Sequence, residues 1–165
     1  TGSKARHLHV PGSEKAIEAV EFLSGKVDVG ENPVIIGGGL TGCEIAYELC
    51  LKGKKPSIVE MKDDLIAVKG VCLANSSYLR DYFALNKTPI YLETMVRLIK
   101  DDGVVVVDKE GTETFIKASA VISSIGYTPS PISKKGRHVH LVGDCFGVGN
   151  LRTVIWRAWD VAMKI

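Results

Sequence analysis

Short apolar runs alternate with a helical segment in the first half of the chain. The apolar run 34–36 ends in glycines, and the segment 41–52 that follows has the spacing of an amphipathic helix. Gly53 suits the C-terminal cap of this helix, and a second apolar run, 56–60, comes next. The pattern therefore predicts a strand, a helix and a second strand in direct succession. The helix would pack through Gly42, Ile45, Ala46 and Leu49.

The period of the pattern changes again after residue 60. A helix is predicted over about 72–86 and a third strand over 89–93. Short alternating runs follow, separated by Asp-Gly and Glu-Gly turns that are typical of hairpins. With a returning strand at 120–125, the pattern predicts an α/β protein. Its Rossmann-like parallel sheet would have helices on both faces and a three-stranded antiparallel β-meander, formed by 95–100, 104–108 and 112–117.

The two ends of the chain lie outside this alternation. Ser13 is predicted to cap a short helix, and Ser24-Gly25 would end it. The apolar face of that helix would consist of Ala16, Ile17, Val20 and Leu23. Near the other end, 138–142 alternates like a strand and 151–165 is predicted to be the last helix.

A glycine motif joins the first predicted strand to its helix, because Gly37, Gly39 and Gly42 have the spacing G-x-G-x-x-G. In such a turn the first glycine permits the tight bend and the second lets the backbone approach a pyrophosphate. The third lets the helix lie close to the sheet. The helix N-terminus offers unpaired N–H groups to the phosphates. The motif predicts a dinucleotide site made by Gly37, Gly38, Gly39, Leu40, Thr41 and Gly42.

Glu60 ends the second predicted strand, 21 residues after Gly39. A Rossmann unit places there the acid that binds the adenosine ribose hydroxyls. Glu60 would repel a 2′-phosphate and Lys62 would attract one, but the neighbouring Asp63 and Asp64 reduce the positive potential. We therefore expect NADH rather than NADPH. The cofactor-binding residues at this strand end are expected to be Glu60, Met61 and Lys62.

Composition and charge narrow the function further. The chain has 165 residues, a net charge of +2 and a pI of about 8.3, which is too mild to indicate nucleic-acid binding. No membrane-spanning stretch or signal peptide is visible, and the cysteines form no C-x-x-C pair. A cytoplasmic protein with reduced thiols is expected. Two H-x-H pairs, 7–9 and 138–140, would form a metal site only on neighbouring strands; without carboxylates, no metal is expected.

The chain resembles the two-dinucleotide-binding-domain flavoproteins, the glutathione-reductase-like class. It resembles in particular the C-terminal part of 2-enoate reductases and 2,4-dienoyl-CoA reductases, through the residues at 37–46, 143–145 and 149–153. The resemblance implies a connector and edge of an FAD domain over 1–30. It further implies an NAD(P)H-binding domain over 31–129 and a returning segment of the FAD domain over 130–165.

The resemblance also implies roles for single residues. Asp144, which follows Gly143, would bind the ribityl chain of the flavin. Glu44 would lie beside the nicotinamide and the flavin, although a carboxylate in the first turn of a helix is also favoured by the helix dipole. The backbone at the end of the returning strand would contact the ribose and the nicotinamide. That group consists of Ser124, Ile125 and Gly126.

Members of this family pass electrons from NAD(P)H to FAD, then to a 4Fe-4S cluster and to FMN in a TIM barrel. The FMN reduces the C=C bond of a 2-enoate or an enoyl thioester. The resemblance therefore implies that FAD is shared with a missing half of the FAD domain. The cluster, the FMN and the barrel would lie elsewhere in a parent chain, and the fragment alone would bind NADH with little or no turnover.

Two alternatives to this interpretation stay open. The same module occurs in other flavoprotein reductases, such as those of the ferredoxin or glutamate-synthase type, whereas a thioredoxin reductase is disfavoured by the missing C-x-x-C pair. The chain could also be a non-catalytic nucleotide-binding module. That module would bind nucleotide without any hydride transfer.

Overall fold

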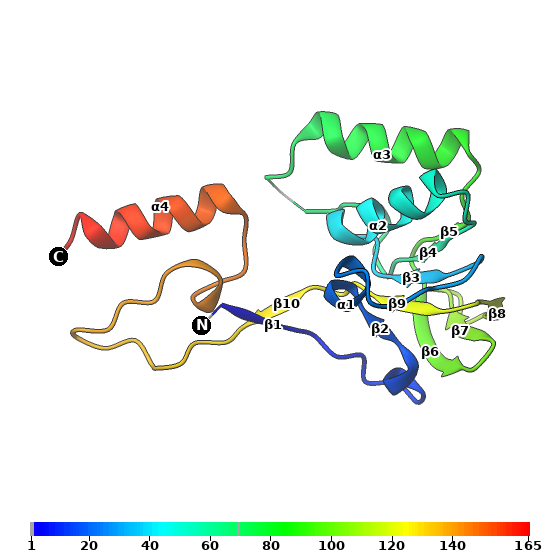
Figure 1. The fold of residues 1–165 in the computed structure, drawn as a ribbon, viewed down its shortest axis with the longest axis horizontal. Helices are drawn as coiled ribbons and strands as arrows, with labels where there is room; N and C mark the ends of the chain where they lie inside the picture. Colours follow the sequence, from blue (N-terminus) through cyan, green and yellow to red (C-terminus); the bar gives the residue numbers. More distant parts are fainter. Residues whose placement is uncertain (1, 69) are drawn as a thin grey trace. The chain divides into compact units, whose positions relative to one another are not determined.

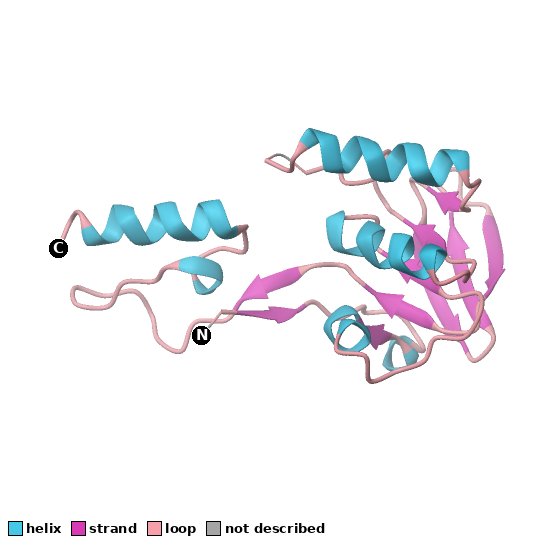
Figure 2. Ribbon diagram, turned by 45° about the horizontal axis from the view of Figure 1, so that its top comes forward, coloured by secondary structure: helices cyan, strands magenta, loops and turns pink. Residues whose placement is uncertain are grey.

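The computed structural model describes residues 2–68 and 70–165 (Figures 1 and 2). Its internal contacts divide the chain into two compact units. The larger unit spans 7–125, and the smaller unit combines the N-terminal segment up to residue 6 with 126–165. Within the segment 1–30, which we expected to be a connector and edge of an FAD domain, residues 7–30 belong by their contacts to the larger unit.

A five-stranded parallel sheet forms the centre of the larger unit. The strand order is β2 (Ile17–Glu18), β9 (Val121–Ser123), β3 (Val34–Ile36), β4 (Ser57–Val59) and β5 (Ile90–Tyr91). In the middle of the sheet Ile35 pairs with Ile122 on one side and with Ile58 on the other. The carboxyl end of this central strand leads directly into the glycine motif.

Neighbouring residues of each strand face two different cores, because side chains alternate between the faces of a sheet. Ile35, Ile58 and Ile122 are fully buried against the helices α1 (Ala19–Leu23), α2 (Leu40–Leu51) and α3 (Leu73–Leu85). The opposite face, with Val34 and Ile36, packs against an antiparallel meander. The meander consists of β6 (Met95–Lys100), β7 (Gly103–Val107) and β8 (Glu113–Lys117).

The predicted fold class, an α/β protein with a parallel sheet and a three-stranded meander, is confirmed. The arrangement of the layers differs in one respect from the prediction of helices on both faces. Among the described residues of the larger unit, α1, α2 and α3 all pack into the same core. The other face is covered by apolar residues of the meander, such as Ile99 and Val104, which take the place of a second helical layer.

The N-terminal part of this unit also differs from the single helix that its spacing predicts. A short 3-10 helix, η1 (Ser13–Lys15), is followed by β2 and then by the five-residue helix α1. Ile17 pairs with Ile122 as an edge strand, so sheet formation outweighs the helical pattern here. The buried face of α1 consequently differs from the predicted face, which included Val20 and Leu23. Ala19 and Phe22 are buried, whereas Val20 and Leu23 are each 53% exposed.

The smaller unit contains an antiparallel pair, β1 (Ser3–Ala5) with β10 (Tyr127–Pro129), the 3-10 helix η2 (Gly143–Cys145) and the helix α4 (Leu151–Ala162). The strand predicted at 138–142 does not form, and the segment makes only an isolated bridge between Gly136 and Val139. Residues 7–10 do not form a strand either. A four-histidine metal site would have needed residues 7–9 and 138–140 on neighbouring strands. Neither of these described segments forms a strand.

Candidate dinucleotide site

The turn from β3 to α2 shows why particular positions are glycine. Gly37 has a φ of +104°, and a Cβ added to it would overlap the carbonyl oxygen of Ser124. A Cβ at Gly42 would overlap the carbonyl oxygen of Gly37, so α2 could not lie so close to the strand. At Gly39, in contrast, no described residue other than its two chain neighbours has an atom within 4 Å of the position of an added Cβ. The open space at Gly39 fits a ligand that approaches the backbone.

The N-terminus of α2 has no side-chain cap among the described residues. Gly39 occupies the N-cap position and offers no side chain. The helix α4 is capped differently, because Asn150 and Thr153 bond to each other's backbone N–H groups at 3.1 and 2.9 Å. The first N–H groups of α2 are therefore available to a ligand. Together with the positive end of the helix dipole they favour a phosphate.

The carboxylate of Glu60 connects the end of β4 to the glycine turn. Its Oε2 accepts a hydrogen bond from the backbone N–H of Gly38 at 2.6 Å, and its Oε1 accepts one from the backbone N–H of Lys62 at 2.9 Å. Glu60 is only 9% exposed. Each carboxylate oxygen has two acceptor sites, so these bonds leave capacity for ribose hydroxyls. The acid lies at the carboxyl edge of the sheet, where open α/β sheets bind their ligands.

The loop after Glu60 is fixed against the glycine turn by two buried residues, Leu65 and Ile66. The backbone N–H of Ile66 donates to the carbonyl oxygen of Gly38 at 2.7 Å. Leu65 Cδ2 lies 2.6 Å from the position that a Cβ of Gly38 would take. Ile66 has a φ of +51°, which is rare for a β-branched residue and persists only where the surroundings enforce it. The part of the loop around Leu65 and Ile66 is therefore bonded and packed against the turn.

Two cations near this loop already have partners. Lys62 Nζ donates to the carbonyl oxygen of Ala67 at 3.2 Å. Arg80, on α3, donates to both carboxylate oxygens of Asp64 at 3.0 and 2.8 Å, and this bonding holds the pKa of Asp64 below its ordinary value. The sequence pointed to Lys62 and Asp64 but not to Arg80. No local signal in the sequence indicates which residue of α3 reaches the loop.

Glu44 has an exposed side chain on α2. We expected it in the first helical turn, and this is wrong because α2 begins at Leu40, one residue earlier than predicted, and its first turn contains no acid. The helix dipole at the N-terminus therefore does not account for Glu44. Its proximity to nicotinamide and flavin stays a prediction.

The end of β9 lies beside the glycine turn. The backbone N–H of Ser124 donates to the carbonyl oxygen of Ile36 at 2.8 Å, and Ile125 packs partly against the meander core. The larger unit thus brings residues 37–42, 60–62 and 124–125 to one edge of its sheet. Gly126 belongs to the smaller unit, where its carbonyl oxygen accepts a hydrogen bond from the backbone N–H of Arg6 at 2.9 Å.

Gly143 and Asp144 also belong to the smaller unit. Gly143 is buried with a φ of +69°, and Asp144 follows it in η2. The carboxylate of Asp144 accepts hydrogen bonds from the backbone of Gly149 at 3.2 Å and from Ser3 Oγ at 3.5 Å. Asp144 therefore ties the N-terminal segment to the loop before α4. Its role towards a flavin stays a prediction.

Cys43, on the inner face of α2, is fully buried, and its thiol donates to the carbonyl oxygen of Gly38 at 3.4 Å. Burial, followed by the negative charge of Glu60, raises the pKa of the Cys43 thiol to about 12. We expect Cys43 to resist alkylation of the folded protein at pH 8, whereas the exposed Cys72 reacts rapidly. Mass spectrometry of peptides after timed labelling measures both rates. Equal rates would contradict the burial of Cys43.

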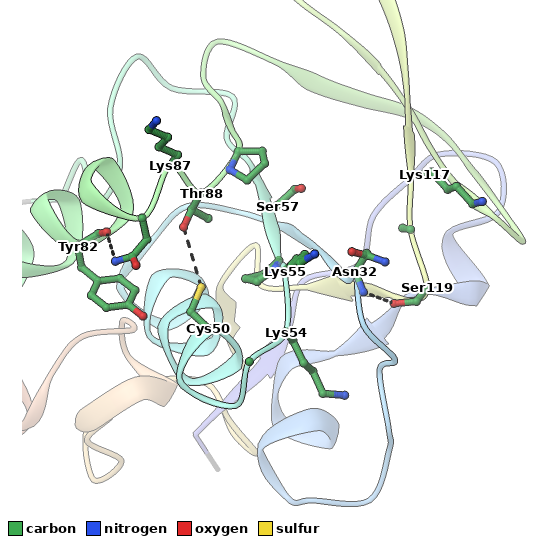
Figure 3. Close-up of a pocket in the computed structure, with 15 residues that line it drawn as sticks. Asn32, Cys50, Lys54, Lys55, Ser57, Tyr82, Lys87, Thr88, Lys117 and Ser119 are labelled. Carbon is green, nitrogen blue, oxygen red and sulfur yellow. Dashed lines mark hydrogen bonds between the residues drawn. The ribbon is translucent and has the colours of Figure 1, made fainter.

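A hollow of about 860 Å³ lies at the opposite edge of the sheet (Figure 3). Its lining includes Asn32, Ser57 and Pro89, which lie at or just before the amino ends of β3, β4 and β5. Several lysines, among them Lys54 and Lys87, also line it. The glycine turn follows the carboxyl end of β3, so this hollow at the amino ends is separate from it. Ligands of open α/β sheets bind beyond the carboxyl ends of the strands.

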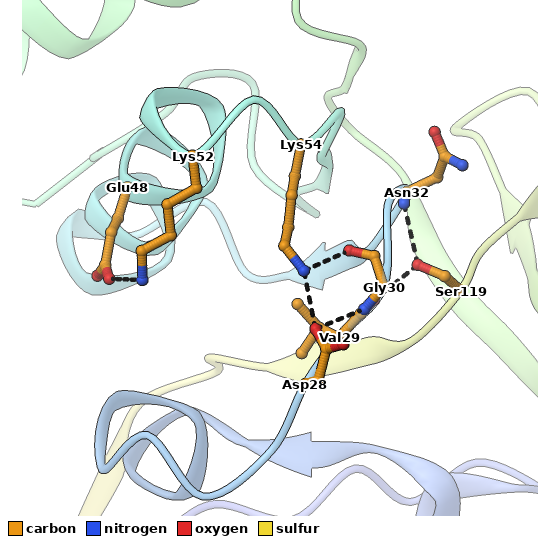
Figure 4. A network of polar contacts seen from close by, with 8 residues as sticks. All are labelled: Asp28, Val29, Gly30, Asn32, Glu48, Lys52, Lys54 and Ser119. Carbon is orange, nitrogen blue, oxygen red and sulfur yellow. Dashed lines mark hydrogen bonds and ion pairs between the residues drawn. The ribbon is translucent and has the colours of Figure 1, made fainter.

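Part of this lining belongs to a polar network that joins three loops (Figure 4). Lys54 Nζ donates to the carboxylate of Asp28 and to the carbonyl oxygen of Gly30, both at 2.8 Å. The Ser119 hydroxyl donates to the carbonyl oxygen of Val29 at 2.7 Å and accepts from the N–H of Asn32 at 2.9 Å. These bonds fix the segment that leads into β3. Lys54 and Ser119 therefore have a structural role in holding these loops together.

Comparisons with known proteins agree with this geometry. The family model described as pyridine nucleotide-disulphide oxidoreductase matches residues 1–144. A cinnamate reductase from Clostridium sporogenes is 36% identical over 100% of this chain and 26% of its own length. An NADH oxidase from Thermoanaerobacter brockii is 35% identical over 100% of this chain and 27% of its own length. The chain thus spans about a quarter of the length of these relatives.

A solved structure of a 2-naphthoyl-CoA reductase complex matches with a TM-score of 0.85 and 24% identity, over 99% of this chain and 26% of that chain. This likeness supports the fold. The family match and the cinnamate reductase, together with the fold shared with this solved structure, confirm the resemblance to flavoprotein reductases of the 2-enoate reductase type. The matched family implies binding of FAD and NAD(P)H. The chain belongs to the pyridine nucleotide-disulphide oxidoreductase family.

Proposed function

We propose that this chain is the NADH-binding part of a multidomain flavoprotein oxidoreductase in which hydride passes from NADH to FAD. One observation supports this most directly. The buried carboxylate of Glu60 is bonded to Gly38, next to the open space at Gly39 and the uncapped N-terminus of α2. This arrangement offers an acceptor for ribose and donors for phosphate within a single turn.

Within this proposal the residues of the chain bind and orient the nucleotide, which supplies the hydride when it is bound. The backbone from Gly39 to Gly42 would contact the pyrophosphate. Glu60 would accept hydrogen bonds from the adenosine ribose, with Met61 and Lys62 at its side. The backbone of 124–126 would line the nicotinamide end, and Glu44 would lie beside the reacting rings.

The smaller unit would contribute Gly143 and Asp144 to an FAD site shared with the rest of the FAD domain. Several apolar side chains of α4 are exposed, including Trp156 at 60% and Trp159 at 58%. Such surfaces are typical of contacts with further protein. The remaining FAD domain and a TIM-barrel domain of a parent chain would be the partners, and FMN and a 4Fe-4S cluster would lie there.

The substrates proposed for the parent enzyme are 2-enoates or enoyl thioesters, whose C=C bond would be reduced. The name of the cinnamate reductase supports this class, since cinnamate is an α,β-unsaturated carboxylate. The name of the NADH oxidase supports NADH as the nucleotide. Among the residues that the structure describes, no helix combines the length and apolar character needed to cross a membrane. A cytoplasmic location stays part of the proposal.

Calorimetric titration with NADH and NADPH of the wild type and of Glu60→Ala tests the nucleotide site. We expect the wild type to prefer NADH. We expect Glu60→Ala to bind NADH about tenfold more weakly, because hydrogen bonds from the ribose to a charged acceptor are lost. Glu48→Ala, which removes the same charge elsewhere on the larger unit, should bind NADH like the wild type.

Glu60 also bonds to the Gly38 N–H, so circular dichroism must establish that each variant is folded. Glu60→Gln provides a second comparison, since the amide keeps one acceptor oxygen for Gly38 but loses the charge. Its preference for NADH over NADPH should shrink. A folded wild type that binds neither nucleotide would overturn the proposed function.

A further inference from the structure

Arg80 reaches from α3 to the wall of the glycine turn. Its Nη2 donates to the carbonyl oxygen of Leu65 at 2.5 Å, and the side chains of Leu65 and Glu60 both lie beside Gly38. The guanidinium is thus bonded to the loop that packs against Gly38, the residue whose N–H donates to Glu60.

The guanidinium of Arg80 forms an ion pair with the carboxylate of Asp64. The two hydrogen bonds, from Nε to Oδ1 and from Nη2 to Oδ2, form the bidentate geometry that Arg and carboxylate groups prefer. The side chains of Arg80 and Asp64 are 32% and 54% exposed, so water screens the pair only in part. The loop that bears Asp64 is itself held to the turn through Ile66 and Gly38. These bonds together hold the carboxylate of Asp64 beside the guanidinium of Arg80.

A 2′-phosphate on the adenosine ribose would need a cation at this place. Lys62 is bonded to Ala67 within its own loop, and Arg80 is neutralised by Asp64. Glu60 and Asp64 would both repel the phosphate. We propose that Asp64 is a specificity-determining residue, which keeps Arg80 from a 2′-phosphate and acts with Glu60 to favour NADH over NADPH. This inference rests on the proposed function, because it concerns the same nucleotide site.

The test is calorimetric titration of Asp64→Ala with NADPH and NADH. Removal of the carboxylate frees Arg80 and removes one repelling charge, so NADPH affinity should rise about five- to tenfold. NADH affinity should change less than twofold. Asp63→Ala is the matched control, since it removes the same charge from the neighbouring position while the Arg80–Asp64 pair stays intact. Its gain in NADPH affinity should be clearly smaller than that of Asp64→Ala, because it removes a nearby charge without freeing Arg80.

The double variant Asp64→Ala/Arg80→Ala separates the two contributions of Asp64. If Arg80 binds the phosphate, most of the gain in NADPH affinity disappears in the double variant. An equal gain in Asp64→Ala, in Asp63→Ala and in the double variant would overturn the role of Arg80. An unchanged affinity ratio in a folded Asp64→Ala that still binds NADH would overturn the inference while leaving the proposed function intact. Absence of NADH binding by the wild type would contradict the proposed function itself.

Discussion

Replacement of Gly42 by alanine is expected to lower the free energy of unfolding by about 3 kcal/mol. The added Cβ would overlap the carbonyl oxygen of Gly37 and lie 3.3 Å from Ile35 Cγ2. A backbone carbonyl cannot rotate aside as a flexible side chain can, so α2 would have to move off the sheet. This movement would loosen the contacts of Ile45 and Leu49, which are both 1% exposed. Urea unfolding followed by circular dichroism measures the loss.

The sign of this result is informative, because alanine is intrinsically a better helix former than glycine by about 1 kcal/mol. A destabilised Gly42→Ala variant therefore reflects the overlap and not helix propensity. NADH binding should be lost as well, since the turn and the helix N-terminus would both shift. A variant as stable as the wild type would show that α2 and the backbone of Gly37 are farther apart than described.

The fold could be predicted from the sequence where its signals are local. The glycines after β3, the helical face of α2 and the Asp-Gly turn of the meander each lie within a few residues of the element that they define. The helix predicted over 13–24 was wrong because Ile17 pairs with Ile122, which lies at the far end of the unit in sequence. The alternation at 138–142 predicted a strand, but a strand also needs a neighbour, and among the described residues the segment finds only one bridge.

In the candidate site, too, the features with local sequence signals could be predicted and those that depend on distant contacts could not. The glycine spacing and the distance to Glu60 identified the turn and the acid, because both follow from the fixed geometry of a strand, a helix and a strand. The structure adds that Glu60 bonds to Gly38 and that Ile66 adopts a positive φ to reach the same residue. Neither follows from residue types, since isoleucine is among the least expected residues in that conformation. Contacts between the loop and α3, such as that of Arg80, depend on tertiary packing alone.

Gly39→Ala is expected to bind NADH about a hundredfold more weakly than the wild type, without a comparable loss of stability. Gly39 has a φ of −68°, which alanine adopts freely, and no described residue other than its two chain neighbours has an atom within 4 Å of an added Cβ. The methyl group would instead occupy the space through which a pyrophosphate must approach the backbone. The cost to folding should stay below about 1 kcal/mol, the amount by which alanine is a poorer N-cap than glycine. Calorimetric titration and urea unfolding of the same preparation measure both quantities.

Gly39→Ala and Gly42→Ala are matched, because each adds one methyl group to the same turn. Weakened NADH binding in both, with a loss of stability only in Gly42→Ala, would distinguish a glycine required by a ligand from a glycine required by the fold. If Gly39→Ala bound NADH as the wild type does, the pyrophosphate could not pass over this residue. The open space at Gly39 would then have no part in nucleotide binding, and Glu60 would have to act with a different phosphate site.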